Sequence, residues 1–501
     1  MKQVIIIGAG GAGLCAALGA KEQGAKVTVI TKEYPTRSQT SMAQGGINGV
    51  LNSANDSIQS HIADTLKSSQ NLASHKQIEF MCHEAPKAIE WLDTIGVNFS
   101  KDEQGNIAQR KLGGASGVRA CYAKDYTGLK ILHTLYDRCL KEGVEFLNEH
   151  HLLEILTTTN SDVIGVSVLD KLSGEVKVLS SSVVVLATGG FAKLYAKHST
   201  NSVASSGDGV AIAHRAGAKL KHMEFVQFHP TALKGSSILI SESARGAGGY
   251  LINSKGERFV DELLGRDVVS RAIDEQIKNS QEVFLDISHL SEEFIKQELP
   301  QEYKLAKLYE GVDATKNPIP IKPAAHYTMG GIEVDSKCRT NIKGLFAVGE
   351  CAEHGVHGAN RLGGNSLLEI VVFGRVAGKE AAKEAKDELC EASAKSIDYI
   401  FEYENSVNFY QKRDELSEIF YNYVGLVRDE AGLKKALSFV KETKANINKM
   451  GVSDKHRGFN TNLSDFLEFI NLLDIAEVVA NAALANTTNI GANYRSDGRS
   501  L

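Results

Sequence analysis

The sequence lacks the features that mark several common classes of protein. Its seven cysteines are scattered and form no C-x-x-C pair, which argues against an iron–sulfur cluster, a structural zinc site or disulfide exchange within this chain. No apolar run reaches the length of a membrane span. The net charge of -5, without a basic run or basic residues interleaved with aromatics, gives no reason to expect nucleic acid as a partner. We predict no metal site.

The length and the position of the first strand set further expectations. A chain of 501 residues is long enough for two or three domains. Its first predicted strand begins at residue 3, which leaves no room ahead of it for a signal peptide or an anchor. We therefore expect a cytoplasmic protein.

The stretch Val4–Gly13 combines a short apolar strand with a glycine turn that opens a helix over Ala12–Gln23. Gly8, Gly10 and Gly13 match G-x-G-x-x-G. In this motif the first glycine permits the tight turn, the second lets the backbone approach a pyrophosphate, and the third lets helix and strand pack closely. A diphosphate would lie at the N-terminus of the helix. The pattern predicts a dinucleotide site; the alternative is a glycine turn that binds nothing.

A second predicted strand, Lys26–Thr31, supports the dinucleotide interpretation. It is followed by Lys32, where a simple NAD site usually carries an acidic residue for the ribose. The next stretch, Tyr34–Val50, is polar and rich in glycine. It could be a surface linker, but hydrogen-bonding side chains and glycines are concentrated in it, at Arg37, Ser38, Thr40, Gln44, Gly45 and Gly46.

This loop resembles the flavin-contacting loop in the flavoprotein subunits of succinate dehydrogenases and fumarate reductases, and in the related L-aspartate oxidases. Five further runs resemble the same family in order and in approximate spacing: Glu224–Leu233, Ile238–Gly246, Leu264–Arg271, Ala324–Gly331 and His357–Glu369. The resemblance implies an α/β fold. A Rossmann-like FAD-binding domain would comprise residues 1–229 and 331–382, an inserted α+β capping domain residues 230–330, and a C-terminal helical domain residues 383–501.

The resemblance also implies which residues contact FAD. A helix over Leu367–Ala382 would direct its N-terminus at the flavin and stabilise the negative charge of the reduced ring. Asp208 taken alone is more often a turn or N-cap residue. The predicted cofactor-binding residues are Gly8, Gly10, Gly13, Lys32, Ser38, Thr40, Gln44, Gly45, Gly46, Asp208, Glu350, Ser366 and Leu367.

The same resemblance implies a fumarate or succinate site. A dicarboxylate that leaves water needs cations and hydrogen-bond donors at both of its ends, because unpaired buried charge is costly. The predicted substrate-binding residues are His229, Ser241, His326 and Arg361. A single histidine would by itself more often be a structural residue.

By resemblance Arg266 is the proton donor to the substrate carbon, and Glu242 with Arg245 is the relay that returns a proton to it. An ordinary arginine has a pKa of roughly 12.5 and is a poor acid. Cationic neighbours and desolvation can lower that pKa. For either pair alone, an ordinary surface ion pair, such as Arg266 with Asp267, is an equally good interpretation.

Two positions distinguish members of the family. Gln39 occupies the place where respiratory succinate dehydrogenases carry a histidine covalently attached to FAD. An amide cannot form that linkage, so we predict non-covalent FAD and a preference for fumarate reduction. Leu112 occupies the place where L-aspartate oxidases carry a glutamate for the substrate ammonium, which favours an unsubstituted dicarboxylate.

The remaining chain is expected to contain strands of a smaller β unit at Val144–Leu156 and Val163–Leu169, and a buried strand within Ser182–Gly190. Predicted helices are Ser57–Ser69, Gln77–Leu92, Ser396–Ser417, Glu430–Asn446 and Asn462–Ala485.

The overall prediction is an FAD-dependent fumarate reductase or succinate dehydrogenase flavoprotein. Electrons would come from a separate iron–sulfur subunit, and a membrane-associated or quinone-linked subunit would place the chain peripherally on the inner face of the cell membrane. The alternatives are an L-aspartate oxidase of NAD biosynthesis and an FAD-binding partner without turnover of its own. The sequence leaves open the physiological direction, the electron donor and the number of subunits.

Overall fold

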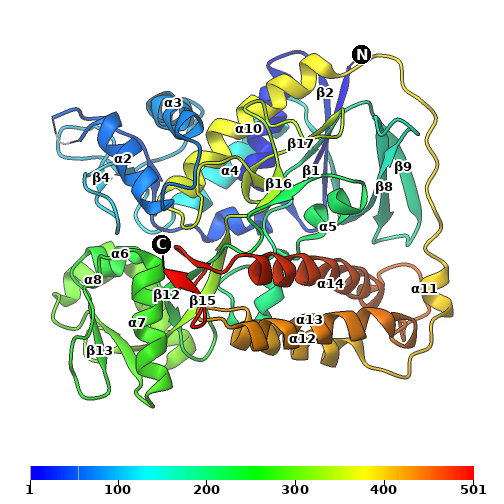
Figure 1. The fold of residues 1–501 in the computed structure, drawn as a ribbon. Helices are drawn as coiled ribbons and strands as arrows, with labels where there is room; N and C mark the ends of the chain where they lie inside the picture. Colours follow the sequence, from blue (N-terminus) through cyan, green and yellow to red (C-terminus); the bar gives the residue numbers. More distant parts are fainter. Residues whose placement is uncertain (1, 55, 501) are drawn as a thin grey trace.

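The computed structural model describes residues 2–54 and 56–500, and a five-stranded parallel sheet lies at its centre (Figure 1). The strand order is β17-β10-β1-β2-β6, and every neighbouring pair is parallel. The strands are β1 (Gln3–Ile7), β2 (Lys26–Thr31), β6 (Glu145–Asn148), β10 (Val184–Leu186) and β17 (Leu345–Ala347). The chain thus returns to this sheet after long excursions, which confirms the predicted α/β class.

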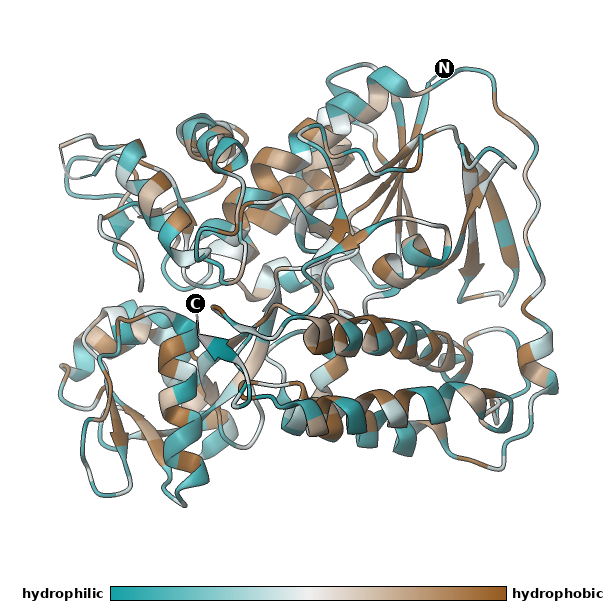
Figure 2. Cartoon of the chain, in the orientation of Figure 1, coloured by the Kyte–Doolittle hydropathy of each residue, from teal (hydrophilic) through white to brown (hydrophobic). Residues whose placement is uncertain are grey.

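Both faces of the central sheet are buried, because consecutive side chains of a strand point to opposite faces. In β1, Val4 and Ile6 belong to one apolar cluster, and Ile5 and Ile7 belong to the other. Apolar residues are concentrated on these central strands and on α14, whereas the outer helices α12 and α13 alternate in hydropathy (Figure 2). The continuous apolar run of β1 is therefore explained by burial on two sides.

Two helices pack on one face of the sheet with their backbones in close contact. Helix α1 (Gly11–Lys21) consists almost entirely of small and apolar residues, and it lies against α10 (Asn365–Glu384). A Cβ atom added to Gly378 would lie 1.9 Å from the carbonyl oxygen of Ala16, and one added to Gly19 would lie 2.6 Å from that of Arg375. Glycine is required at this crossing because no side chain fits between the two backbones.

The predicted strand Val144–Leu156 is wrong in one respect, because the run divides into two strands that belong to different sheets. Strand β6 joins the central sheet, whereas β7 (His150–Thr157) pairs with β8 (Val163–Asp170) and β9 (Val176–Ser180). Glu149, between β6 and β7, has a positive φ of 59°. This left-handed residue redirects the chain in a way that the apolar pattern does not reveal.

A second, antiparallel sheet and its helices lie beside the central domain (Figure 1). Its strand order is β12-β15-β14-β13, comprising β12 (Val226–Leu233), β13 (Tyr250–Asn253), β14 (Val283–Asp286) and β15 (Ile319–Thr328). The associated helices are α6 (Glu242–Gly246), α7 (Arg266–Lys278), α8 (Glu292–Glu298) and α9 (Pro300–Leu305). This unit has its own apolar cluster, from Leu233 to Ile321. We call the residues from β12 to β15 the capping unit.

The C-terminal part is helical, with α11 (Tyr399–Glu402), α12 (Phe409–Tyr423), α13 (Glu430–Ala445) and α14 (Thr461–Ala485). The single helix predicted over Ser396–Ser417 is wrong. The backbone of Glu404 and Ser406 bonds to the carbonyl oxygens of Asn448 and Lys449, and α12 begins only after Asn408, whose side chain caps it. Tertiary pairing and the cap override the charged helical pattern.

The remaining elements connect these units. They are the helices α2 (Ile58–Ser68), α3 (His75–Thr94), α4 (Thr127–Lys141) and α5 (Asp208–Arg215), and the short strands β3 (Ile47–Asn48), β4 (Gln109–Arg110), β5 (Ala120–Cys121), β11 (Leu220–Lys221), β16 (Gly331–Glu333), β18 (Ala352–Glu353), β19 (Thr488–Asn489) and β20 (Arg499–Ser500). Over residues 2–54 and 56–500, no helix has both the length and the hydropathy of a membrane span.

A buried ion network joins the C-terminal helix α14 to the central sheet. Lys32, at the end of β2, lies 2.7 Å from Asp208 and 2.6 Å from Glu468 of α14. Lys193 also pairs with Glu468, and Asn471 donates a hydrogen bond to Asp208. Burial alone would lower the pKa of Lys32, but the two carboxylates outweigh it and raise that pKa. The network thus stabilises Lys32 and its two carboxylate partners in their ionised forms.

Glu468→Gln should destabilise the protein, because it removes the carboxylate that Lys32 and Lys193 share while both cations remain in place. We expect a loss of roughly 3–5 kcal/mol in the free energy of unfolding. Glu477→Gln, on the same helix but at a more exposed ion pair with Lys444, should cost less than about 1 kcal/mol. Urea unfolding followed by circular dichroism measures both. Equal losses would contradict the role of the network.

Candidate functional site

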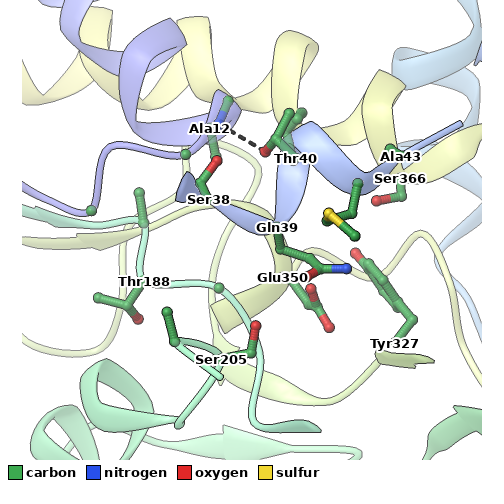
Figure 3. Close-up of a pocket in the computed structure, with 18 of the residues that line it drawn as sticks. Ala12, Ser38, Gln39, Thr40, Ala43, Thr188, Ser205, Tyr327, Glu350 and Ser366 are labelled. Atoms are coloured by element: carbon green, nitrogen blue, oxygen red, sulfur yellow. Dashed lines mark hydrogen bonds between the residues drawn. The ribbon is translucent and has the colours of Figure 1, made fainter. Parts of the chain in front are cut away.

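A cavity begins at the carboxyl ends of β1 and β2 and reaches the capping unit, with about 1670 Å³ of empty space that includes open solvent at its mouth. Its walls come from the glycine turn, the loop at residues 34–46, the strand ends of the capping unit and the start of α10. Figure 3 shows polar side chains from these separate segments, including Ser38, Gln39, Glu350 and Ser366, around one space. Such a crevice outside the carboxyl ends of parallel strands is the usual binding place in α/β folds.

The three fingerprint glycines have different surroundings. Gly8 has a φ of +109°, and a Cβ atom there would lie 2.2 Å from the carbonyl oxygen of Ala187. A Cβ atom on Gly13 would lie 1.9 Å from the carbonyl oxygen of Gly8, so Gly13 is a packing residue and is absent from the cavity wall. Gly10 lines the cavity, and a Cβ atom on it would meet nothing nearer than Thr40 at 3.6 Å.

The loop at residues 34–46 presents polar atoms that lack partners among the described residues. The Ser38 hydroxyl and Gln44 Oε1 are buried without a hydrogen bond, and both residues line the cavity. Thr40 accepts a hydrogen bond of 3.0 Å from the Gly11 amide (Figure 3). Gly45 and Gly46 also line the cavity, and Gly46 has a φ of +129°. This set suits a polar ligand at the start of α1.

At one end of the cavity, Lys32 and Asp208 line the wall but bind each other. His151 lies beside them, and neither of its ring nitrogens has a hydrogen-bond partner in the described chain. Burial lowers the pKa of His151, so its imidazole is neutral near pH 7. His151 was missed at the sequence level, because nothing in the pattern of a small sheet distinguishes it.

At the other end, two guanidinium groups meet on one amide. The Gln227 Oε1 atom accepts hydrogen bonds from Arg266 at 3.0 Å and from Arg361 at 3.2 Å. All three side chains are buried. Burial, followed by the repulsion of Arg266, lowers the pKa of Arg361 to about 10, which leaves it cationic at neutral pH. Arg361 Nε has no partner among the described groups.

Glu242 is the counter-ion of Arg266. Its Oε2 atom accepts from Arg266 Nη2 at 2.7 Å and from Nε at 3.2 Å. Burial would raise the pKa of Glu242, but Arg266 and Arg245 outweigh it and hold that pKa below its ordinary value. Arg245 lies behind Glu242, with its Nη2 atom 3.9 Å from Oε1, and does not line the cavity. The pairing of Arg266 with Asp267 does not occur, because Asp267 pairs with Arg271.

His229, His326 and Ser241 face the same end of the cavity. The two imidazole centroids are 5.0 Å apart. His229 Nδ1 accepts a hydrogen bond from the Thr231 amide at 3.2 Å, so the proton of the neutral ring lies on Nε2. Burial, followed by the charge of Arg266, lowers the pKa of both histidines well below 6.5. Ser241 is the N-cap of α6.

Glu350, Ser366 and Leu367 also line the cavity. Glu350 Oε1 accepts a hydrogen bond from the Thr328 amide at 2.9 Å, and burial raises the pKa of Glu350 to about 7. Ser366 and Leu367 lie in the first turn of α10, which begins two residues earlier than the predicted helix.

Comparison with known proteins identifies the family. An FAD binding domain model matches residues 3–367, and a model for the fumarate reductase flavoprotein C-terminus matches residues 413–500. The chain is 39% identical to a succinate dehydrogenase flavoprotein subunit of Rickettsia bellii, covering 99% of this chain and 90% of that one. It is 38% identical to the 8-methylmenaquinol:fumarate reductase flavoprotein subunit of Wolinella succinogenes, covering 99% and 85%.

A solved structure agrees with these matches. A variant of the quinol fumarate reductase of E. coli superposes with a TM-score of 0.94 at 34% identity, covering 99% of this chain and 92% of that chain. The chain belongs to the succinate dehydrogenase/fumarate reductase flavoprotein family. It is an FAD-dependent oxidoreductase.

The residues of this family member fit FAD. The glycine turn leaves Gly10 open to the cavity, and the unpartnered Ser38 and Gln44 offer hydrogen bonds to a polar cofactor. Of the predicted cofactor-binding residues, the cavity gathers all except Gly13. Of the predicted substrate and catalytic residues, it gathers all except Arg245. The roles of the individual residues stay predictions.

Sequence reasoning missed two buried residues that support Arg361 in this flavoprotein. Gln227 could have been found, because it precedes His229 by two positions in β12 and therefore points to the same side. Tyr327 places its ring under Arg361, with the guanidinium carbon 4.3 Å from the ring centroid, and donates a hydrogen bond of 2.6 Å to Glu369. Tyr327 and Glu369 are far apart in the sequence, so no local pattern predicts this contact.

Gly10→Ala and Gly13→Ala should separate cofactor binding from folding. In the flavin-free protein, Gly10→Ala should leave the unfolding free energy nearly unchanged, while FAD binds about tenfold or more weakly because the methyl group projects into the cavity. Gly13→Ala should cost roughly 1–3 kcal/mol of stability through overpacking. Flavin fluorescence titration and thermal unfolding measure the two effects. Undiminished FAD affinity in Gly10→Ala would contradict the assignment.

Proposed function

We propose that this flavoprotein interconverts fumarate and succinate, with Arg266 as the proton donor. The proposal is carried by one observation: buried Arg266 and Arg361 converge on Gln227 at the same end of the cavity. The neutral His229 and His326 line that end and add hydrogen-bond donors. Cations and donors gathered in this way suit a substrate with a carboxylate at each end.

The charges at this end favour a dianion. Arg266, Arg361 and Arg245 are cationic, and among the described residues Glu242 is the carboxylate that pairs with both Arg266 and Arg245. Among these groups alone, three positive charges meet one negative charge, and a dicarboxylate would neutralise that excess. Arg361 would hold one carboxylate, and His229, Ser241 and His326 would donate hydrogen bonds to the substrate.

The chain's own residues orient the substrate and move one proton. FAD, when bound, supplies the hydride that one carbon of fumarate receives. Arg266 would give a proton to the neighbouring carbon, so that hydride and proton together convert fumarate into succinate. Glu242, at 2.7 Å from Arg266, and Arg245 behind it would return a proton to the guanidinium. The geometry of this relay compensates for the weak acidity of arginine.

The main alternative, L-aspartate oxidase, is disfavoured by Leu112. This side chain is buried and lines the cavity, where an amino acid substrate would need a partner for its ammonium group. An apolar side chain offers no such partner. Peroxide formation that depends on aspartate would restore this alternative, and a chain that binds FAD but lacks both activities would be a non-catalytic partner.

Gln39 supports non-covalent FAD. It lines the cavity, and its Oε1 atom accepts a hydrogen bond of 2.7 Å from the Ser202 amide. An amide has no nucleophilic nitrogen for a bond to the flavin. Because a covalent bond raises flavin potential in this family, its absence favours fumarate reduction.

We further propose how the chain is organised and partnered. The capping unit, with predicted limits of 230 and 330, would close over the site and exclude water. The relatives' names describe subunits, which supports assembly with other chains. Electrons would come from an iron–sulfur subunit, and the chain would lie in the cytoplasm, docked peripherally on the membrane through a quinone-linked subunit.

Arg266→Gln tests the proton donor. Fumarate reduction by the FAD-loaded protein with a reduced dye should fall on the order of 10²–10⁴-fold, because the amide cannot deliver the proton. FAD content should be unchanged. Lys278→Gln, which removes an exposed cation from the far end of the same helix, should retain wild-type turnover. Ordinary turnover in Arg266→Gln would remove this residue from the mechanism.

Acid precipitation tests the mode of FAD attachment. Trichloroacetic acid unfolds the protein, so flavin held without a covalent bond should appear in the supernatant. Absorbance of the supernatant and fluorescence of the washed pellet measure the partition. Yellow colour that stays in the pellet would show a covalent linkage that Gln39 cannot explain.

A further inference from the structure

Two buried carboxyl groups meet where the capping unit contacts the FAD-binding side of the molecule. Asp125 lies in the turn between β5 and α4, and Glu302 lies on α9 of the capping unit. Both residues have 0% solvent exposure. Neither belongs to the cavity wall or to the proposed relay, and each side chain is far from the other in sequence.

The conformation of the turn that carries Asp125 directs this side chain into the protein interior. Lys124 adopts a positive φ of 50°, an uncommon conformation for a non-glycine residue. Asp125 Oδ2 then accepts a hydrogen bond of 2.7 Å from the Gln301 amide, at the start of α9. A carboxylate of the FAD-binding side thus contacts the backbone of the capping unit directly.

Glu302 connects this contact to the helix that carries the proposed relay. Its Oε1 atom accepts a hydrogen bond of 3.3 Å from the hydroxyl of Ser243. Ser243 lies on α6 between Glu242 and Arg245. The position of Glu302 therefore influences the position of α6.

The remaining oxygens, Asp125 Oδ1 and Glu302 Oε2, are buried and have no conventional donor among the described residues. Glu302 directly follows Gln301, whose amide binds Asp125, and the charge of Asp125 acts on Glu302. Two ionised carboxylates have no hydrogen to share, so Asp125 and Glu302 can hydrogen-bond to each other only when one of them carries a proton. A proton on one carboxyl would give these two unpartnered oxygens a donor.

The charged surroundings do not supply a substitute for that proton. Arg110 interacts electrostatically with both carboxyls, but it donates hydrogen bonds to the carbonyl oxygens of Gln44, Gly45 and Lys124. Tyr126 also interacts electrostatically with both carboxyls. Tyr122 and Glu298 interact electrostatically with Arg110. Arg110 thus spans from this contact to the loop at residues 34–46.

We propose that Asp125 and Glu302 share one proton and form a pH-sensitive positioning pair that holds α6 and the capping unit against the FAD-binding side. Loss of the proton would leave two buried carboxylates facing each other with no donor between them. The contact between the capping unit and the turn at residues 123–126 would then loosen. The effect on turnover rests on the proposed function, whereas the effect on stability and hydrogen exchange does not.

The direction of the pH dependence follows from the proton count. Burial, and then Asp125, raise the pKa of Glu302 to about 8 from an ordinary value of 4.5. Between these two pH values the folded chain binds a proton that the unfolded chain releases. Stability from this group therefore falls as the pH rises from 4.5 towards 8 and is fully lost above 8.

The test compares Glu302→Gln with wild type in the FAD-loaded full chain. Glutamine is nearly isosteric and always carries a donor, so it mimics the protonated acid. Thermal unfolding between pH 6 and pH 8.5 should show a smaller decrease in Tm for Glu302→Gln than for wild type. Glu103→Gln, at an exposed position, should follow the wild-type curve. Parallel pH curves for Glu302→Gln and wild type would overturn the proposal.

Hydrogen exchange provides a second readout, which uses the wild-type chain and so does not depend on the variant folding. After correction for the intrinsic rate, peptides covering α9 and residues 123–126 should lose protection between pH 7 and pH 9. Peptides covering the central sheet should not. Uniform protection across this range would overturn the proposal even if Glu302→Gln failed to fold.

Turnover separates this proposal from the proposed function. If the wild type reduces fumarate, its activity should fall with a midpoint near pH 8, and Glu302→Gln should remove that decrease. If neither protein reduces fumarate while their unfolding curves differ as expected, the proposed function fails and the pair stands. An unchanged alkaline decrease in an active Glu302→Gln would count against the pair.

Discussion

The electrostatic constraint behind this structure is the burial of Arg266 and Arg361 beside one another. Like charges in a dry site repel and each loses its hydration, so the fold must supply compensating contacts. Gln227 provides one acceptor to both groups, Glu242 neutralises Arg266, and the face of Tyr327 supports Arg361. These partners come from β12, α6 and β15, and therefore the capping unit must be in place before the site exists. The remaining positive charge is what the proposed dicarboxylate would neutralise.

The central domain meets a different constraint, which is room for a cofactor against the backbone. The central domain provides this room by having glycine where backbones approach closely. Helices α1 and α10 touch at Gly19 and Gly378, and Gly13 lies against the carbonyl of Gly8. Close contact places the N-terminus of α1 and the first turn of α10 on the same cavity. These glycines thus serve close backbone packing, whereas Gly10 is open to a ligand.

Motifs predicted which residues the cavity gathers better than they predicted the chain path. The fingerprint, the loop at residues 34–46 and the runs around His229, Arg266 and Arg361 each carry local patterns, so their residues could be named in advance. The division between β6 and β7 depends on one left-handed residue, Glu149, and the break before α12 depends on pairing with residues 448–449. Neither feature produces a periodic pattern in the sequence from which it could be predicted. Asp125 and Glu302 meet only through the tertiary fold, and no sequence window contains both.

The two ends of the cavity differ in a way that indicates where charged ligands are expected. Near the end of β2, Lys32 is matched by Asp208 and Glu468, so the protein neutralises its own charge there. At the capping unit, Arg266 and Arg245 pair with Glu242 and Arg361 acts on it electrostatically, and the lowered pKa values of His229 and His326 prevent further positive charge from accumulating at neutral pH. Protonated histidines would increase the repulsion, whereas neutral ones donate hydrogen bonds without adding charge. The balance thus leaves a positive excess at the capping-unit end of the cavity, which is the property that a dianion would recognise.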